Sequence, residues 1–520
     1  MIYFNGKVLT VDRVFSTAGA FAVRGDRFVA VGSDAQVRRL AARSTRLVDL
    51  KGATVVPGFA DSHDHLWNSA RFEFHGVNLI GVRSVAVMQD RLRAALAKEP
   101  PGRALFTSLG WSISPAPTRQ DLDAVSATTP IILLSSRHAS GVVNTAALRQ
   151  LGITRSNPSY KGGKVPVDGT GEPTGVLPGY PLSLTMVHDL LPPPTPAEQD
   201  DFLGKGMAQR NALGITSTHE LALWPDGRAG LERMRREGKL TLRMALGLEF
   251  PDEDRTDEAV AALPRPDRRD PWLFIDSIGE EPWVPGMATL PDYTALLRKE
   301  RQLGWRPAPH VSADKARGAT YDEALDQTLA AFEAVDRTAP LRAQRWYVEH
   351  APFATPAEIA RLSRLGAIVS VQDSGYEPMA PPPLPPERMA RQNPLRSLLD
   401  QGIVVIGGSD YRTATAEEPA PNNPMNLIYF YTTRRNKAGG LTAPAERISR
   451  AEALRILTAN PAYATFEEGR KGRIAPGLLA DFVILDHDLM TVPDEALLKI
   501  RPLATFVGGR RVYAAPGGRF

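Results

Sequence analysis

The segment with the clearest chemical signal is VVPGFADSHDHL, at residues 55–66. His63 and His65 are one residue apart at the end of an apolar run that predicts a strand. Because side chains alternate along a strand, this spacing places both imidazoles on one face. Two imidazoles fixed in this way suit a divalent metal such as Zn²⁺. The same spacing also occurs without a metal, so the pair by itself is only a candidate.

Three further residues stand where predicted strands end. His310 follows WRPAP, His350 ends RWYVEH and Asp410 ends IVVIGGSD. In a barrel of parallel strands the carboxyl ends converge on one face, where active sites lie. Each residue alone could be an ordinary loop histidine or an aspartate that caps a helix. Their shared position at strand ends, together with the histidine pair, favours one common metal centre.

The elements that must position these residues alternate between short apolar strands and helices. Three helix starts, at Thr195, Thr355 and Ser449, have a hydroxyl residue followed three positions later by Glu. This pattern is typical of a helix N-terminus. Alternating strands and helices indicate βα units, so we expect an α/β fold with a (β/α)8 TIM-like barrel; a doubly wound open sheet is the alternative. The strand candidates lie at 55–60, 131–135, 215–218, 242–248, 308–311, 346–349, 368–371 and 403–406.

Both ends of the chain are rich in short β segments with glycine turns. We therefore expect residues 1–55 and 470–520 to form one composite β-sandwich domain, with the barrel over 56–469. Two unrelated β caps are the alternative. Proline-rich stretches at 190–198 and 377–390 interrupt the middle of the chain, and either a pocket wall or a rigid surface loop would suit them.

Composition excludes several classes of protein. The 520 residues include no Cys, which rules out disulfides, thiolate nucleophiles and Cys-bound zinc. The net charge is only +4 and no block of like charge would follow a phosphate backbone, so no nucleic-acid partner is expected. No apolar run approaches ~18 residues and the N-terminus lacks a leader pattern, so we expect a cytoplasmic protein without a membrane partner. A homodimer is the base-rate expectation.

Motifs along nearly the whole chain resemble the amidohydrolase superfamily, in the branch that includes N-substituted formamide deformylase. The matching segments are PGFADSHDHL (57–66), SSRHASGVVNTAALRQLGI (135–153), GEPTGVL (171–177), ALGITSTHE (212–220), RWYVEHA (345–351), VSVQ (369–372), GIVVIGGSD (402–410), ILTANPA (456–462) and GRIAPGLLADFVILD (472–486). The resemblance implies a metal-dependent hydrolase barrel with a composite β domain. It also implies that the metal ligands are His63, His65, His310, His350 and Asp410.

One departure from the family pattern concerns the bridging ligand. Many members carry a carbamylated Lys that bridges two metals, but the corresponding segment here, PWLFIDSIGEEPW (271–283), has no Lys. Glu280 and Glu281 lie nearby, and we expect neither of them to take its place. The sequence therefore predicts one tightly held metal, with Zn²⁺ as the expected ion and a second, weaker site left open.

A metal site of this kind would activate water, because a bound cation lowers the pKa of its water from 15.7 towards ~7. Asp410 would accept the proton and return it to the leaving nitrogen as general base and acid. His138 and His219 are candidates for polarising the substrate carbonyl, although either could be a core histidine. Trp111 could line the substrate pocket or simply pack. Asp314 could orient a ligand or cap a helix.

The predicted activity is hydrolysis of a C–N bond in an amide, formamide or cyclic amide of a small molecule. A metal-dependent lyase, such as a decarboxylase on a similar barrel, is the alternative enzyme. A binding protein that has kept the fold and lost the chemistry is the alternative outside catalysis. No motif in the loops identifies the substrate.

Overall fold

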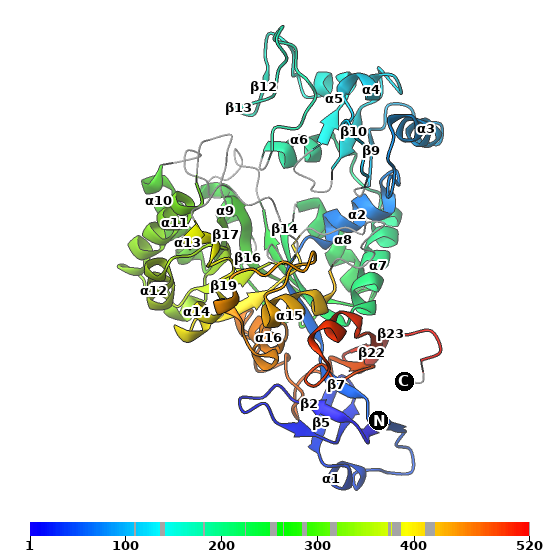
Figure 1. Ribbon diagram of the computed structural model, residues 1–520, viewed down its shortest axis with the longest axis vertical. Helices are drawn as coiled ribbons and strands as arrows, with labels where there is room; N and C mark the ends of the chain where they lie inside the picture. The colour runs from blue at the N-terminus through cyan, green and yellow to red at the C-terminus, as the bar shows by residue number, and fades with distance from the viewer. Residues whose placement is uncertain are drawn as a thin grey trace.

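The computed structural model describes residues 1–108, 111–135, 141–179, 182–223, 225–249, 257–263, 265–282, 289–311, 320–372, 376, 386–410, 422–518 and 520. Three parts are stacked along the long axis of the molecule (Figure 1). The barrel is in the middle and the sheets built from the chain ends are below it. The described residues between 77 and 195, here called the insertion, are above it.

Eight strands form one parallel sheet in chain order, which confirms the predicted barrel. The last strand returns to the first, where the Asp410 N–H donates to the His63 carbonyl at 2.8 Å. The strands are β8 (Phe59–Asp64), β14 (Ile215–Leu223), β15 (Arg243–Leu248), β16 (Leu273–Pro282), β17 (Pro307–Val311), β18 (Tyr347–His350), β19 (Ile368–Val371) and β20 (Val405–Gly407).

Two strand assignments differ from the sequence prediction. The candidate at 131–135 is β10 (Ile131–Leu134), which belongs to a separate three-stranded sheet in the insertion with β9 (Leu105–Phe106) and β11 (Gly141–Val143). The barrel strand absent from the candidate list is β16. Its sequence LFIDSIGEEP contains polar residues that are buried in the barrel, including Asp276 and Glu280, so it lacks a continuous apolar run.

Helices surround the barrel (Figure 1). The helix starts predicted at Thr195, Thr355 and Ser449 are confirmed, because each hydroxyl accepts from the N–H three residues later and that Glu side chain accepts from the cap N–H. These helices are α7 (Pro196–Ala212), α12 (Pro356–Leu365) and α16 (Arg450–Ile456). The other helices of this part are α2 (Leu66–His75), α8 (Pro225–Arg236), α9 (Asp257–Ala262), α10 (Leu290–Leu303), α11 (Tyr321–Asp336), α13 (Pro386–Met389), α14 (Leu395–Asp400), α15 (Pro424–Thr433) and α17 (Ala459–Ala464), with 3₁₀ turns η2 (Arg342–Gln344), η3 (Pro444–Glu446) and η4 (Asp494–Lys499).

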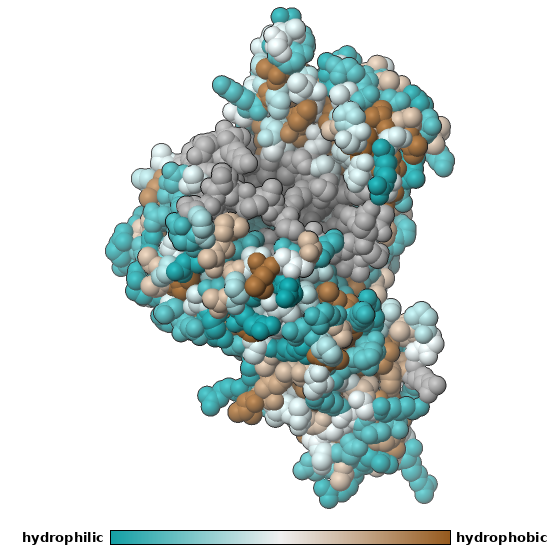
Figure 2. Space-filling model, in the orientation of Figure 1, coloured by the Kyte–Doolittle hydropathy of each residue, from teal (hydrophilic) through white to brown (hydrophobic). Residues whose placement is uncertain are grey.

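The largest apolar core lies between the barrel strands and these helices. Leu246 and Val348 of the strands are buried in it together with Phe332 and Leu454 of the helices. Burial of each such side chain stabilises the folded state by about 1.5–3 kcal/mol. The barrel is therefore a stable support for the loops at its strand ends. On the face drawn in Figure 2, hydrophilic residues cover much of the outer surface of the barrel helices.

Strands from both ends of the chain share one sheet. In the six-stranded sheet β7 (Thr54–Pro57) pairs antiparallel with β21 (Phe482–Leu485), and β7 leads directly into the barrel strand β8. A four-stranded sheet packs beside it, and its Tyr3 ring contacts the Phe482 ring of the six-stranded sheet with 5.2 Å between ring centres. The boundaries at 55/56 and 469/470 stay a prediction. The other strands are β1 (Ile2–Phe4), β2 (Lys7–Leu9), β3 (Thr17–Ala18), β4 (Ala20–Arg24), β5 (Arg27–Gly32), β6 (Leu47–Asp49), β22 (Pro502–Val507) and β23 (Arg510–Ala514), with helix α1 (Asp34–Arg38).

The insertion has its own small apolar core around β9, β10 and β11. Its remaining elements are α3 (Val85–Leu96), α4 (Arg119–Asp123), α5 (Thr145–Gln150), the hairpin β12 (Ser159–Tyr160) and β13 (Gly163–Lys164), and α6 (Leu182–Leu190). Among the helices that the structure describes, none has the length and apolar character needed to cross a membrane.

Candidate metal centre

The histidine pair lies at the end of strand β8, as the sequence predicts, with His63 inside the strand and His65 directly after it. Both rings are buried, and the His63 side chain is 0% exposed. Asp64 between them points away, where its carboxylate accepts from Arg210 Nη2 at 2.6 Å and Nε at 2.9 Å. This alternation leaves the two imidazoles on the same side, 5.2 Å apart between ring centres.

Hydrogen bonds at Nδ1 orient both rings. His63 Nδ1 lies 2.6 Å from Glu349 Oε2, and His65 Nδ1 lies 3.1 Å from the Leu221 carbonyl oxygen. With Nδ1 as the donor in each ring, Nε2 is left with its lone pair towards the centre of the site. His63 Nε2 is buried and has no hydrogen-bond partner among the described residues. This arrangement fits a ring that coordinates a metal through Nε2.

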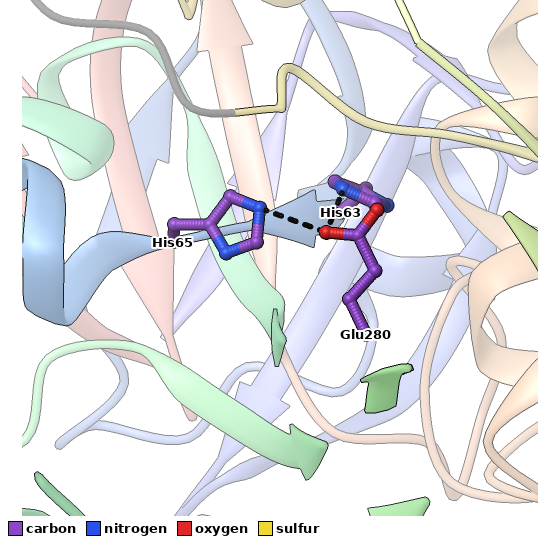
Figure 3. Close-up of side chains that lie close together, drawn as sticks. All are labelled: His63, His65 and Glu280. Carbon is purple, nitrogen blue, oxygen red and sulfur yellow. Dashed lines mark ion pairs between the residues drawn. The ribbon is translucent and has the colours of Figure 1, made fainter. Parts of the chain in front are cut away.

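Glu280 of strand β16 lies between two pairs of histidines. Its Oε2 atom is 3.5 Å from His63 Nε2 and 3.4 Å from His65 Nε2 (Figure 3). Its other oxygen, Oε1, contacts His310 Nδ1 and lies 2.7 Å from His350 Nε2. Glu280 therefore lies inside the cluster, and the expectation that it does not take the place of the bridging Lys stays a prediction. Strand β16, whose buried residues include polar ones, carries this carboxylate into the histidine cluster.

The residues predicted at the ends of strands β17, β18 and β20 meet in the same place. His350 Nε2 lies 3.0 Å from His310 Nδ1. Asp410 Oδ1 lies 3.5 Å from His65 Nε2 and 3.7 Å from His63 Nε2. His350 has φ = 72° and Asp410 has φ = 60°, so both adopt the left-handed conformation that costs free energy outside glycine. Such conformations concentrate at functional sites.

Close contact between the first and last barrel strands fixes Asp410. The neighbouring Ser409 donates to the Asp61 carboxylate from its N–H at 2.9 Å and from its hydroxyl at 2.6 Å. A Cβ atom on Gly408 would lie 2.4 Å from the backbone nitrogen of His63. Glycine at 408 therefore allows the backbone of β20 to reach the histidine pair.

The charges of the cluster favour a bound cation. Burial opposes a charged His63, but Glu280 and Glu349 raise the pKa of that imidazole well above its ordinary value. Burial also opposes a charged His65, and hydrogen bonds with Asp410 and Glu280 raise its pKa to about 10. Burial would raise the pKa of Glu280 and Asp410, yet the surrounding imidazoles hold both well below the usual range. The same negative potential that holds protons here attracts metal ions.

Within the part of the chain that the structure describes, three overlapping groups of side chains have ligand atoms within 4.8 Å of one another. They are His63, His65 and Glu280; His63, His350 and Asp410; and Glu280, His310 and His350. Imidazole nitrogens and carboxylate oxygens are the donors that Zn²⁺ and similar divalent ions accept. The residues present therefore fit a metal, and Glu280 belongs to two of the three groups.

His219 lies in the barrel interior, and its Nε2 is 3.0 Å from Ser277 Oγ. Burial lowers the pKa of this imidazole from 6.5 to about 4, so the ring is neutral near pH 7. Its neighbour Glu220 points the other way, as alternation predicts, and accepts from the N–H groups of Leu66 at 2.7 Å and Trp67 at 2.8 Å. Glu220 thereby anchors the first turn of α2 directly after His65.

Trp111 is half-buried against the apolar core of the insertion, and its indole N–H donates to the Leu134 carbonyl. These contacts describe a packed side chain, and a place in the substrate pocket stays a prediction. His138, Asp314 and the proline-rich residues 377–385 lie outside the described residues. The roles predicted for His138 and Asp314 also stay predictions.

Known proteins of similar sequence or structure match this chain over nearly its whole length. The sequence model of the amidohydrolase family matches residues 46–513. N-substituted formamide deformylase from Arthrobacter pascens is 27% identical over 563 aligned positions, which cover 99% of each chain. An uncharacterised metal-dependent hydrolase from Pyrococcus horikoshii OT3 superposes with a TM-score of 0.71 at 21% identity, covering 95% of this chain and 99% of that one. Atrazine chlorohydrolase from Arthrobacter aurescens TC1, in its complex with zinc, superposes with a TM-score of 0.53 at 15% identity, covering 99% and 95%.

Proposed function

The chain belongs to the amidohydrolase family, and from that premise we propose that it is a metal-dependent hydrolase that cleaves a C–N bond in an amide, formamide or cyclic amide. The motif resemblance to this family is confirmed. The similarity to N-substituted formamide deformylase over full length makes N-substituted formamides the first substrates to assay.

The observation that carries the proposal is the division of the Glu280 carboxylate between two histidine pairs. One oxygen faces His63 and His65, and the other faces His310 and His350. A carboxylate in this position suits a bridge between two divalent ions. The proposal therefore extends the single tight site expected from the sequence to two sites that share Glu280. Zn²⁺ suits both sets of donors.

Asp410 is the residue best placed to move a proton. Its side chain is 36% exposed, whereas His63 is 0% exposed and Glu280 is 5% exposed, so Asp410 lies on the open side of the cluster. The imidazoles beside Asp410 outweigh its burial and hold its pKa well below the usual range, so the carboxylate is ionised at neutral pH. A weak base of this kind would accept a proton only from a water made acidic by a bound cation. It can then return that proton to the leaving nitrogen. A divalent ion, when bound, supplies a lowered water pKa and polarises the substrate carbonyl.

The alternative enzyme, a metal-dependent lyase, is distinguished by its products. Hydrolysis of a formamide releases an amine and formate, whereas a decarboxylase releases CO₂. A binding protein without catalytic activity would release neither. The ionised and accessible Asp410 supports hydrolysis over the binding protein, because a site that has lost its chemistry no longer needs a proton acceptor.

The test is to measure metal content and amide hydrolysis in wild type, Glu280→Gln and His487→Asn. We expect about two divalent ions per wild-type chain and at most one per Glu280→Gln chain. The Glu280→Gln variant should also lose at least ~100-fold in kcat/KM, because removal of a residue that only supports a metal ligand already costs up to that much. His487 is an exposed histidine and its variant should match wild type. Full metal content and full activity in Glu280→Gln would refute the shared site. Active wild type without any metal would refute the function itself.

A further inference from the structure

We propose that Glu349 is a positioning residue that tightens metal binding through His63. The inference rests on the proposed function, because His63 must be a metal ligand for it to hold. Glu349 would act without touching the metal or the substrate, by fixing the ring of His63 and making its Nε2 a stronger donor. The evidence is in the geometry, the burial and the backbone of strand β18.

The two histidines of the pair are held by different kinds of oxygen. His63 Nδ1 lies 2.6 Å from a carboxylate oxygen of Glu349, whereas His65 Nδ1 lies 3.1 Å from a neutral backbone carbonyl. A hydrogen bond to an ionised acceptor is shorter and roughly twice as strong as one between neutral groups. A carboxylate at Nδ1 also increases the basicity of the ring as a ligand. The asymmetry therefore marks His63 as the more strongly supported ligand.

The Glu349 carboxylate is fully buried and has few donors. Its exposed fraction is 0%, and its Oε1 atom has no hydrogen-bond partner among the described residues. Besides His63, the described residues give Oε2 one further contact, a long one of 3.4 Å from Gln372 Nε2. A buried charge with so little compensation is costly. A divalent ion on the far side of the His63 ring would offset the cost of burying a carboxylate at this position.

The backbone lets one strand end supply both Glu349 and a ligand. Alternation along β18 would turn Glu349 and the next residue, His350, to opposite sides. The left-handed conformation of His350, with φ = 72°, breaks this alternation, and Ala351 follows with φ = 47°. As a result Glu349 reaches His63 while His350 reaches Glu280. Two consecutive side chains therefore serve the same centre.

The experiment measures zinc affinity by competition with a chromophoric chelator in the full chain, independently of catalysis. Glu349→Gln keeps the volume of the side chain and removes its charge, and we expect about 10-fold weaker binding of one zinc ion. Glu349→Ala removes the hydrogen bond as well, and we expect a loss towards 100-fold. The absorption spectrum of the Co²⁺-loaded Glu349→Gln protein should also shift, because the donor strength of one imidazole has changed.

Glu446→Gln is the matched control, because Glu446 is a buried carboxylate that accepts from Ser397 N–H at 2.9 Å and Ser397 Oγ at 2.7 Å. It should lose stability without losing zinc affinity. If wild type binds zinc tightly and Glu349→Gln has the same zinc affinity and the same Co²⁺ spectrum, the role of Glu349 is overturned and the proposed function is not. A wild-type chain that binds no divalent metal would overturn both this role and the proposed function. If Glu349→Ala does not fold, the isosteric Gln variant decides.

Discussion

His219 illustrates how a single buried residue contributes to the pH dependence of stability. Burial holds the pKa of its imidazole near 4 in the folded state, against 6.5 for an ordinary histidine. Below pH 6.5 the unfolded chain takes up a proton at this residue that the folded chain refuses until about pH 4. The contribution of His219 to stability is therefore present above pH 6.5 and is lost as the pH falls from 6.5 to 4.

We predict that His219→Gln flattens this part of the stability profile. The wild type should lose about 2–3 kcal/mol more than the variant between pH 7 and pH 4, since each pKa unit corresponds to about 1.4 kcal/mol. Urea unfolding followed at several pH values measures the difference. His487→Asn removes an exposed histidine and should retain the wild-type slope. Parallel profiles for wild type and His219→Gln would show that the buried ring does not carry this effect.

Residues of the site differ in how far the sequence could predict them. His63 and His65 could be placed on one face because alternate residues of a strand share a side. His350 and Asp410 could be brought near them because parallel strand ends converge. Glu349 could not be predicted, because alternation along a strand would turn its side chain away from that of His350. The left-handed backbone at His350 changes this, and no sequence pattern indicates that conformation.

At the scale of elements, the contact between strands β8 and β20 determines whether the site can assemble. There is no room for a side chain at Gly408, because an added Cβ would lie 2.4 Å from the backbone nitrogen of His63 and 2.5 Å from the Cβ of His63. Backbone cannot yield as a flexible side chain can. The steric limit at 408 therefore belongs to the strand pair as a unit.

We predict that Gly408→Ala lowers stability by about 1–3 kcal/mol, the usual cost of overpacking, and weakens metal binding, because it separates Asp410 from His63. Thermal unfolding and chelator competition measure the two effects. Gly204→Ala is the control, since this glycine lies in helix α7 with no atom within 4 Å of the added carbon. The control should be neutral or up to about 1 kcal/mol more stable. Equal behaviour of the two variants would contradict the steric account.

Elements defined by local chemistry could be predicted and those defined by context could not. The helix starts at Thr195, Thr355 and Ser449 follow from hydrogen bonds within four residues. The strand at 131–135 could be recognised, but an apolar run does not say which sheet it joins. Strand β16 is not among the strand candidates because its buried positions carry Asp276 and Glu280. Their burial is stabilised by partners elsewhere in the chain, including Arg268 and Arg306 for Asp276 and His350 for Glu280.

At the scale of the whole molecule, one buried ion pair joins the barrel to the terminal sheets. Arg243 of β15 donates to Asp481 from Nε at 2.7 Å and from Nη2 at 3.0 Å, and Asp481 also accepts from the Gly508 N–H at 2.7 Å. Both side chains are buried. Removing one partner leaves an uncompensated charge inside the protein, which typically costs 3–5 kcal/mol.

We predict that Asp481→Asn lowers the free energy of unfolding by about 3 kcal/mol and leaves zinc affinity unchanged, because the pair is remote from the metal centre. Asp267→Asn removes the partner of Arg269, whose side chain is 90% exposed, and should lower the free energy of unfolding far less than Asp481→Asn does. Denaturant unfolding compares the two. A similar small loss in both variants would mean that the buried pair adds little to the joint between the two parts.

The metal centre lies where the first and last barrel strands, β8 and β20, meet, and this position has a consequence for stability. His63 belongs to the strand that opens the ring and Asp410 follows the strand that completes it, so nearly 350 residues of chain lie between two neighbours in space. An ion coordinated by both would act as a cross-link over a very long loop, comparable in topology to a disulfide in a protein that has no cysteine. Loading with metal would then slow the opening of the ring as well as enable its chemistry.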